Sequence, residues 1–309
     1  ATAGVFAVLT AIFRSVLAAS LERWLIVAAF LALALISLLS TFTWAFGGIC
    51  LLVLALLIVY ALRGWDCSPV KHRIPGREPA ACRWIVAAGA LAFFALVSIW
   101  TACRVFSFNT PTFDFGIFAQ MFHSMKTTGL PITTVERDGP LSHFAVHVSP
   151  IYYLLLPFYS LVPAPATLQV LQAAVLASAA IPLWKIGKHH GLSPVMRTLI
   201  CFVLLLYPSY AGGTSYDIHE NAFLTPLTLW LFCGIDRRNS LITGLAGVLI
   251  LMVKEDAAVY VAVIALYLLL RAVLQGRKKW DLAAGTSLLL GAIVWFAAVT
   301  GYLSTSGDG

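Results

Sequence analysis

Long runs of apolar residues, separated by polar and basic segments, dominate this chain. Several runs reach or approach the ~20 residues that a helix needs to cross the hydrocarbon core of a bilayer. They show no strict alternation of apolar and polar residues, so we expect helices and not the strands of a barrel. We predict nine membrane spans, at about residues 24–40, 43–62, 84–103, 166–184, 198–211, 221–235, 241–253, 257–271 and 282–303.

Two apolar segments do not fit this pattern. Residues 1–20 carry Arg14 and are either a surface helix or the remnant of another span, so they stay unassigned. The stretch Ile151 to Val162 has only 12 residues and contains Pro157. Runs of ~10 to 14 residues are more often interfacial than spanning. We therefore expect this stretch to lie along the membrane surface without crossing it.

Composition agrees with a polytopic, all-α bundle in a cell membrane. Of the 309 residues, 61% are hydrophobic and 11% are charged, which lies outside the range of soluble domains. We predict an N-terminal hairpin of membrane helices with a basic loop at 1–83, and a membrane core at 84–309. The chain begins at Ala1 and ends at Gly309 within a polar stretch, so we expect the core to be truncated at its C-terminus. The net charge of +7 indicates no nucleic-acid partner, because basic residues in a membrane protein set its orientation.

The positions of the charges predict that orientation. The loops at 63–83, 185–197, 237–238 and 271–279 carry 14 of the 20 Lys and Arg residues, which places them in the cytoplasm. The opposite, outer face collects seven of the 13 carboxylates: Asp114, Glu136, Asp138, Asp217, Glu220, Glu255 and Asp256. We therefore expect the active face to be extracytoplasmic.

The longest outer loop, residues 104–148, is too long for a simple connector. Within it, apolar residues recur at helical spacing: Phe115, Phe118, Met121, Phe122 and Met125. This spacing predicts a helix that lies flat on the membrane with Asp114 at its start. Asp114 is either the N-cap of this helix or a general base held at the boundary of water and lipid. Arg137, further along the loop, is a candidate substrate-binding cation.

Two further outer segments gather ionisable residues. These are Asp217, His219 and Glu220 in the second loop, and Lys254, Glu255 and Asp256 in the third. Ionisable groups next to a membrane span are costly unless they are paired or functional. The second loop is therefore either a solvated helix end or a substrate site. The third holds either a structural ion pair or a substrate contact.

His143 and His147 are four residues apart and share a face if their segment is helical. Together with Asp217, His219 or Glu220 they could form a divalent metal site with nitrogen and oxygen ligands. The alternative is that both imidazoles form hydrogen bonds with backbone or lipid phosphate.

Read in order, these features resemble the GT-C superfamily of glycosyltransferases that use polyprenyl-phosphate sugars. The resemblance covers about residues 84–303: a span, a long outer loop with an early acid, a Pro-led aromatic segment from Ser149 to Pro157, and a span that ends in basic residues. It implies that Asp114 is the catalytic base and that residues 150–162 lie along the outer surface. The paired DxD acids of some metal-dependent members are missing here. More narrowly, FDFGIFAQ, the HxSP segment at 147–150, YDIHE and KED resemble a bacterial and archaeal family of uncharacterised membrane proteins.

The function that these features favour is inverting transfer of a sugar from a lipid-linked donor to an acceptor at the outer face. Asp114 would accept the proton of the acceptor hydroxyl, and Lys254, His219 or Arg137 would stabilise the departing lipid phosphate. A transporter or lipid flippase is the rival class, with the outer acids carrying protons or a cation. A scaffold for envelope assembly is a third class. The gathering of acids on one face favours surface chemistry over a path through the membrane.

Overall fold

The computed structural model describes Ala28 and residues 80–110, 112–137, 139–207, 210, 216–274 and 279–306. The predicted spans at 24–40 and 43–62 and the unassigned segment 1–20 lie outside the described residues. Pro111 and Asp138 also lie outside them. The division at residue 83 stays a prediction.

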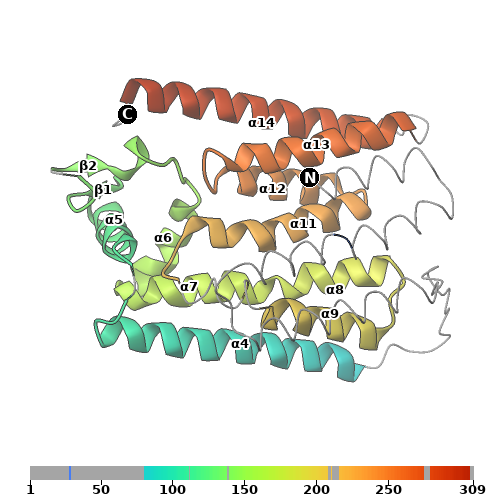
Figure 1. Ribbon diagram of the computed structural model, residues 1–309, viewed down its shortest axis with the longest axis horizontal. Coiled ribbons are helices and arrows are strands. Elements are labelled where there is room, and N and C mark those ends of the chain that lie inside the picture. The colour runs from blue at the N-terminus through green and yellow to red at the C-terminus, as the bar shows by residue number, and fades with distance from the viewer. Residues whose placement is uncertain are drawn as a thin grey trace. The chain divides into compact units, whose positions relative to one another are not determined.

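The described chain is almost entirely helical, which confirms the predicted fold class (Figure 1). Its elements are α4 (Ala80–Phe106), α5 (Asp114–Thr128), β1 (Ile132–Thr133), β2 (Leu141–Ser142), η1 (His143–Ala145), α6 (Tyr152–Leu161), α7 (Pro165–Ser178), α8 (Ala180–His189), α9 (Pro194–Leu206), η2 (Glu220–Phe223), α11 (Leu224–Asp236), α12 (Ser240–Leu251), α13 (Ala257–Leu274) and α14 (Lys279–Ser306). The two short strands pair antiparallel, with Ile132 opposite Ser142.

Four helical segments are long and apolar enough to cross a membrane. They are Ala80–Phe106, Pro165–His189, Ala257–Leu274 and Lys279–Ser306, with 27, 25, 18 and 28 residues. They match the spans predicted at 84–103, 166–184, 257–271 and 282–303. The second of them comprises α7 and α8, which meet at Ala179.

The other three spans predicted in this region are shorter as helices than expected. α9 and α11 have 13 residues each and α12 has 12. A helix of 13 residues is about 20 Å long, less than the ~30 Å hydrocarbon core. Non-helical residues 216–219 and 252–256 adjoin these helices, and non-helical backbone near membrane depth must find its hydrogen bonds within the protein. One such bond runs from the Ile151 N–H to the Met252 carbonyl, at 2.9 Å.

The short elements gather at one end of the bundle. α5, β1, β2 and α6 lie together there, opposite the connections from α8 to α9 and from α13 to α14 (Figure 1). We call the end with these short elements the loop end, and the opposite end the basic end. α4 ends and α7 begins at the loop end. α6, which lies between them in the chain, has only 10 residues, so residues 151–162 stay at the loop end and do not cross the bundle. Which compartment each end faces stays a prediction.

The apolar face of α5 is where the sequence predicted it but has a different partner. Phe118, Met121 and Phe122 are buried in the protein, and Phe122 packs against the rings of Tyr152 and Tyr159 with ring centroids 5.5 and 5.3 Å apart. The prediction that this face lies on lipid is therefore wrong. The face packs on α6 because α6 supplies aromatic rings at the same depth.

Two turns require backbone conformations that favour glycine. Gly129 ends α5 with φ 79°, and its N–H donates to the Met125 carbonyl. Arg238 follows α11 with φ 50°, a left-handed conformation that costs a residue with a side chain about 1 to 2 kcal/mol. The second turn lies at the basic end.

Candidate functional site

The site begins with Asp114, the first residue of α5. Phe113 occupies the N-cap position and no side chain caps the helix, so the N-cap interpretation of Asp114 is wrong. The half-buried carboxylate of Asp114 instead accepts a hydrogen bond from the Tyr216 hydroxyl, at 2.8 Å. That bond is the main reason why the pKa of Tyr216 is raised. Asp114 is thus presented to the segment that carries Tyr216.

Glu220, in η2, is buried and fully engaged. The Tyr152 hydroxyl donates to its Oε2 at 2.7 Å, and Lys254 Nζ lies 3.3 Å from its Oε1. Burial by itself raises the pKa of this carboxyl, but the His219 ring, the Tyr152 hydroxyl and the Lys254 ammonium outweigh burial and hold the pKa below its ordinary value. Glu220 is therefore an ionised group that joins α6, η2 and the turn between α12 and α13.

His219 lies between Asp114 and Glu220 in sequence order and in space. Its Nδ1 accepts the Asn221 N–H at 3.3 Å and lies 3.6 Å from Glu220 Oε2. Burial lowers the pKa of the imidazole, and the nearby Lys254 ammonium adds to that effect against the opposing charges of Glu220 and Asp114. The ring is therefore neutral at pH 7, with Nδ1 as acceptor and Nε2 left to donate.

Glu255 joins the turn between α12 and α13 to the HxSP segment. His147 Nδ1 lies 2.8 Å from its Oε1, and the Val148 N–H donates to Oε2 at 3.1 Å. These hydrogen bonds hold the pKa of Glu255 below its ordinary value, although burial works against them. Residues more than 100 positions apart are thus fastened side by side.

His143 makes a second imidazole–carboxylate pair with Glu136, a residue that the sequence analysis did not single out as a site residue. Its Nδ1 lies 3.1 and 3.0 Å from the two carboxylate oxygens. Its Nε2 is buried and has no hydrogen-bond partner among the described residues. The Phe118 ring packs edge-on against both His143 and His219, at centroid distances of 5.5 and 6.0 Å.

These contacts bring the sequence-separated residues together at the loop end. We call the following set the loop-end cluster: Asp114, Glu136, His143, His147, Tyr152, Tyr216, His219, Glu220, Lys254 and Glu255. It contains four carboxylates and one lysine. Tyr152 and Tyr216 were missed at the sequence level because a tyrosine hydroxyl gives no spacing signal.

Asp217 has a different role from its neighbours. It is completely buried, and its carboxylate accepts hydrogen bonds from the Thr112 N–H (3.1 Å), the Thr112 hydroxyl (2.6 Å) and the Gln169 amide (3.0 Å). Arg104 Nη2 lies 3.4 Å from the same carboxylate. Gln172 accepts the His219 N–H at 2.8 Å. Asp217 therefore positions the loop, and the two glutamines within an apolar run of α7 were the sequence signal for it.

Arg137 and Asp256 are not brought into the cluster. Both are exposed, and the Arg137 guanidinium donates to the Glu136 carbonyl at 2.9 Å. Both were predicted to bind substrate. That role has no geometric support for either residue.

The five proposed metal ligands do not converge as a set. In the part of the chain that the structure describes, no group of three or more His, Cys, Asp or Glu side chains is placed to hold a metal ion. His143 is directed to Glu136, His147 to Glu255, and Asp217 to backbone and amide donors. The residues present do not fit a resident divalent cation.

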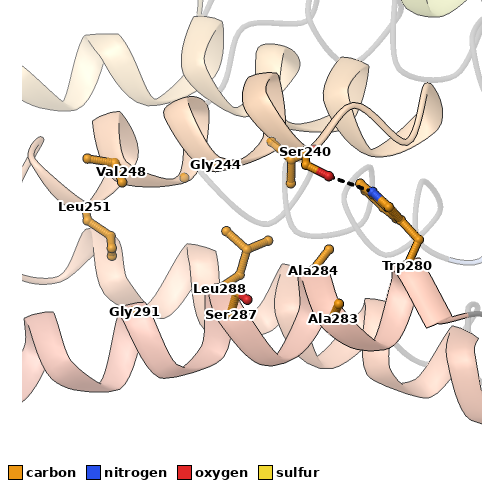
Figure 2. A pocket seen from close by; sticks show the side chains of 12 residues that line it. Ser240, Gly244, Val248, Leu251, Trp280, Ala283, Ala284, Ser287, Leu288 and Gly291 are labelled. Carbon is orange, nitrogen blue, oxygen red and sulfur yellow. Dashed lines mark hydrogen bonds between the residues drawn. The ribbon is translucent and has the colours of Figure 1, made fainter.

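An apolar cavity of about 350 Å³ lies between α12 and α14 (Figure 2). Small residues open it, including Gly244, Gly247 and Gly291, and the Trp280 indole donates to the Ser240 hydroxyl at 3.0 Å. No ionisable residue lines it. Leu251, at its other end, directly precedes the turn that carries Lys254 and Glu255. The cavity has the size and lining for a hydrocarbon chain.

Residues 104–306 match the family described as Predicted membrane protein (DUF2079). The chain belongs to this family. The DUF2079 match runs from Arg104 through α14, so it contains the entire loop-end cluster. It confirms the predicted resemblance to a membrane protein family and a multi-pass membrane location. No curated protein and no solved structure matches the chain, and the resemblance to GT-C glycosyltransferases has no support among these comparisons.

Proposed function

We propose that this protein is a membrane glycosyltransferase that moves a sugar from a polyprenyl-phosphate carrier to an acceptor hydroxyl at the loop end of the bundle. The observation that carries the proposal is the placement of Asp114. Its carboxylate is half-buried, accepts a hydrogen bond from the neutral Tyr216 hydroxyl, and lies close enough to the His219 imidazole to influence its pKa. The Lys254 ammonium acts on the same imidazole. A base and groups that stabilise an anion therefore face the same space.

The reaction divides these groups by charge. The acceptor oxygen attacks C1 of the sugar and gives its proton to Asp114, while the bond from C1 to the phosphate oxygen breaks with inversion. Lys254 has three N–H donors and uses one side of its ammonium on Glu220, so it can also meet the departing phosphate. The neutral His219 offers its Nε2–H to the same anion.

The lipid part of the donor needs an apolar environment next to this site. The cavity between α12 and α14 supplies one, because it ends at Leu251 and the following turn bears Lys254. A phosphate held at Lys254 would leave its hydrocarbon chain at membrane depth. Lipid and a lipid-linked sugar are the partners that this arrangement fits.

The test is the substitution Asp114→Asn, made in the full chain. Asparagine keeps the size and an oxygen that can accept from Tyr216 but cannot accept the proton, so transfer from a polyprenyl-phosphate sugar in liposomes should fall ~100-fold or more. The unfolding midpoint in detergent should stay near that of the unchanged protein. Asp256→Asn is the matched control, because the structure places that carboxylate in solvent. Equal transfer by the Asp114 and Asp256 variants would remove Asp114 from the mechanism.

A proton-coupled transporter is the second candidate, and the two imidazole–carboxylate pairs favour it. His143 with Glu136 and His147 with Glu255 each join an imidazole to a carboxylate, the type of pair that forms proton relays in pumps and transporters. A transporter would move solute across liposomes when a pH difference is imposed and would leave donor sugars intact. Glycosylated product without such movement would exclude it.

A further inference from the structure

A second cavity, of about 270 Å³, lies at the basic end, at the opposite end of the bundle from the loop-end cluster. It is lined by His189, Ile235, Asp236, Arg238, Tyr267, Arg271 and Asp281. These residues come from the end of α8, the end of α11, α13 and the start of α14. Polar residues from four helices thus line one cavity. The proposed transfer reaction uses none of these residues.

The two carboxylates of this cavity already have partners. Arg271 binds Asp281 through two hydrogen bonds, Nη2 to Oδ1 at 2.8 Å and Nε to Oδ2 at 3.1 Å. Asp236 Oδ2 lies 2.8 Å from His190 Nε2. The Arg271 guanidinium also lies 5.6 Å from the centre of the Tyr267 ring, which fixes its plane. Asp281 is therefore engaged through both of its carboxylate oxygens, and Asp236 through one.

Arg238 supplies a guanidinium from a turn that suits glycine better. Its N–H donates to the Ile235 carbonyl at 3.1 Å, and the Asn239 N–H donates to the Gly234 carbonyl at 2.9 Å. This closure of a helix usually has glycine at the left-handed position, where Arg238 has φ 50°. The backbone gains nothing from arginine there. Among the described residues, the Arg238 side chain has no hydrogen-bond or ion-pair partner, although it lines the cavity.

We propose that this cavity binds a phosphate group. Guanidinium groups bind phosphate oxygens in a planar, paired geometry, and the cavity offers one guanidinium fixed in place and one without a partner. The carbonyls at the end of α11 are capped by the N–H groups of residues 237–239, which reduces their repulsion of an anion. Both sources of such a group, a lipid headgroup and a soluble phosphate compound, share this chemistry.

The lining of the cavity carries no net formal charge, because Arg238 and Arg271 are balanced by Asp236 and Asp281. The placement of the charges favours an anion, because Arg238 lines the cavity without a partner among the described residues, while Asp281 binds Arg271 and Asp236 Oδ2 faces His190. Lys185 and Arg237 lie at the same end and add to the positive potential there.

The experiment compares Arg238→Gly with Arg237→Ala in the full chain. The glycine variant removes the cavity guanidinium and relieves the left-handed turn, so without phosphate it should unfold at the same temperature or higher. The alanine variant removes an equal charge from the adjacent residue, which does not line the cavity. Unfolding is followed in detergent with inorganic phosphate against chloride at equal ionic strength, and in nanodiscs of phosphatidylcholine with and without phosphatidylglycerol.

We expect phosphate or phosphatidylglycerol to stabilise the unchanged protein and the Arg237 variant. The Arg238 variant should need roughly tenfold more ligand or higher for the same stabilisation, the range expected for losing a charge-assisted hydrogen bond. Stabilisation by inorganic phosphate identifies a soluble ligand, and stabilisation by phosphatidylglycerol alone identifies a headgroup. No stabilisation by either, or equal loss in both variants, overturns the proposal. An Arg238 variant that is less stable without phosphate overturns it too, because the side chain would then serve the fold.

Discussion

Glu220 shows how a single carboxylate organises the loop end. It is buried in a protein that spans a membrane, where an unpaired charge would cost several kcal/mol. Tyr152 and Lys254 approach it from different elements, and His219 adjoins it in sequence. Because the buried Glu220 carboxylate must keep its partners, it fixes where Tyr152, Lys254 and His219 lie relative to one another. The loop-end geometry therefore depends on ionisation, which makes it sensitive to pH.

Stability should fall as the pH is lowered, in two steps. His219 has a folded-state pKa below its ordinary value of 6.5, so the unfolded chain binds protons first and stability declines from about pH 6.5 downward. Glu220 and Glu255 also have lowered folded-state pKa values, so their contributions are present above about pH 4.5 and are lost as the pH falls through the folded values.

Unfolding midpoints measured from about pH 8 to about pH 3 check this order. The variant His219→Gln should flatten the first decline and leave the second. Glu255→Gln should reduce only the second. A midpoint that rises as the pH falls from 7 to 5 would contradict the assigned directions.

At the scale of elements, sequence periodicity located the helices but not their lengths. Long apolar runs specify where a helix can cross, and α4, α13 and α14 lie close to the predicted ranges. The helices α9, α11 and α12 are each shorter than the hydrocarbon core is thick, and the segments 216–219 and 252–256, which carry Asp217, His219, Lys254, Glu255 and Asp256, are not helical. Their backbone leaves the helix to reach partners such as Ile151, and those partners are more than 100 residues away from residue 252.

The sequence indicated some residues of the candidate site but not their partners. Clusters of charge next to spans pointed to Asp114, Glu220 and Glu255. The burial of Asp217 could not be predicted, because it depends on Thr112 and Gln169, which are distant in sequence, and its substrate contact stays a prediction. The α5 face was assigned to lipid because a spacing of apolar residues tells which face is buried but not what covers it.

The cavity between α12 and α14 makes a prediction for two glycines of α12. A Cβ at Gly244 would meet nothing within 4 Å, whereas a Cβ at Gly247 would lie 2.5 Å from Leu288 Cδ2. Gly244→Ala should therefore raise stability by ~0.5 to 1 kcal/mol through helix propensity. Gly247→Ala gains the same propensity but forces Leu288 to move, so it should be less stable than Gly244→Ala.

Unfolding of both alanine variants in the same detergent gives the comparison. Equal stabilisation by the two substitutions would mean that the Leu288 contact yields without cost. Destabilisation by Gly244→Ala would mean that the space is needed by something other than α12.

At the scale of the whole molecule, the predicted orientation remains to be measured. His190 directly follows α8 and Asp256 directly precedes α13, and both residues are exposed. The prediction places Asp256 outside the cell and His190 in the cytoplasm. In a chain freed of its own accessible cysteines, Asp256→Cys should react with a membrane-impermeant maleimide added to intact cells. His190→Cys should react only after the cells are opened, and strong labelling of it from outside would invert the orientation.

The clamp of Glu255 on His147 and Val148 has a consequence for biosynthesis. The residues around His147 leave the ribosome more than 100 positions before Glu255, and Glu220 precedes Lys254 by 34 positions. Until the turn between α12 and α13 has emerged and α13 has entered the bilayer, α6 lacks its backbone partner and Glu220 lacks its lysine. The Glu220 carboxylate is therefore without its ammonium partner while α11 and α12 are synthesised, with Tyr152 and His219 as its other partners. Insertion of α13 is the step that completes the site, so a chain that stops at α12 should be recognised and degraded as unfinished.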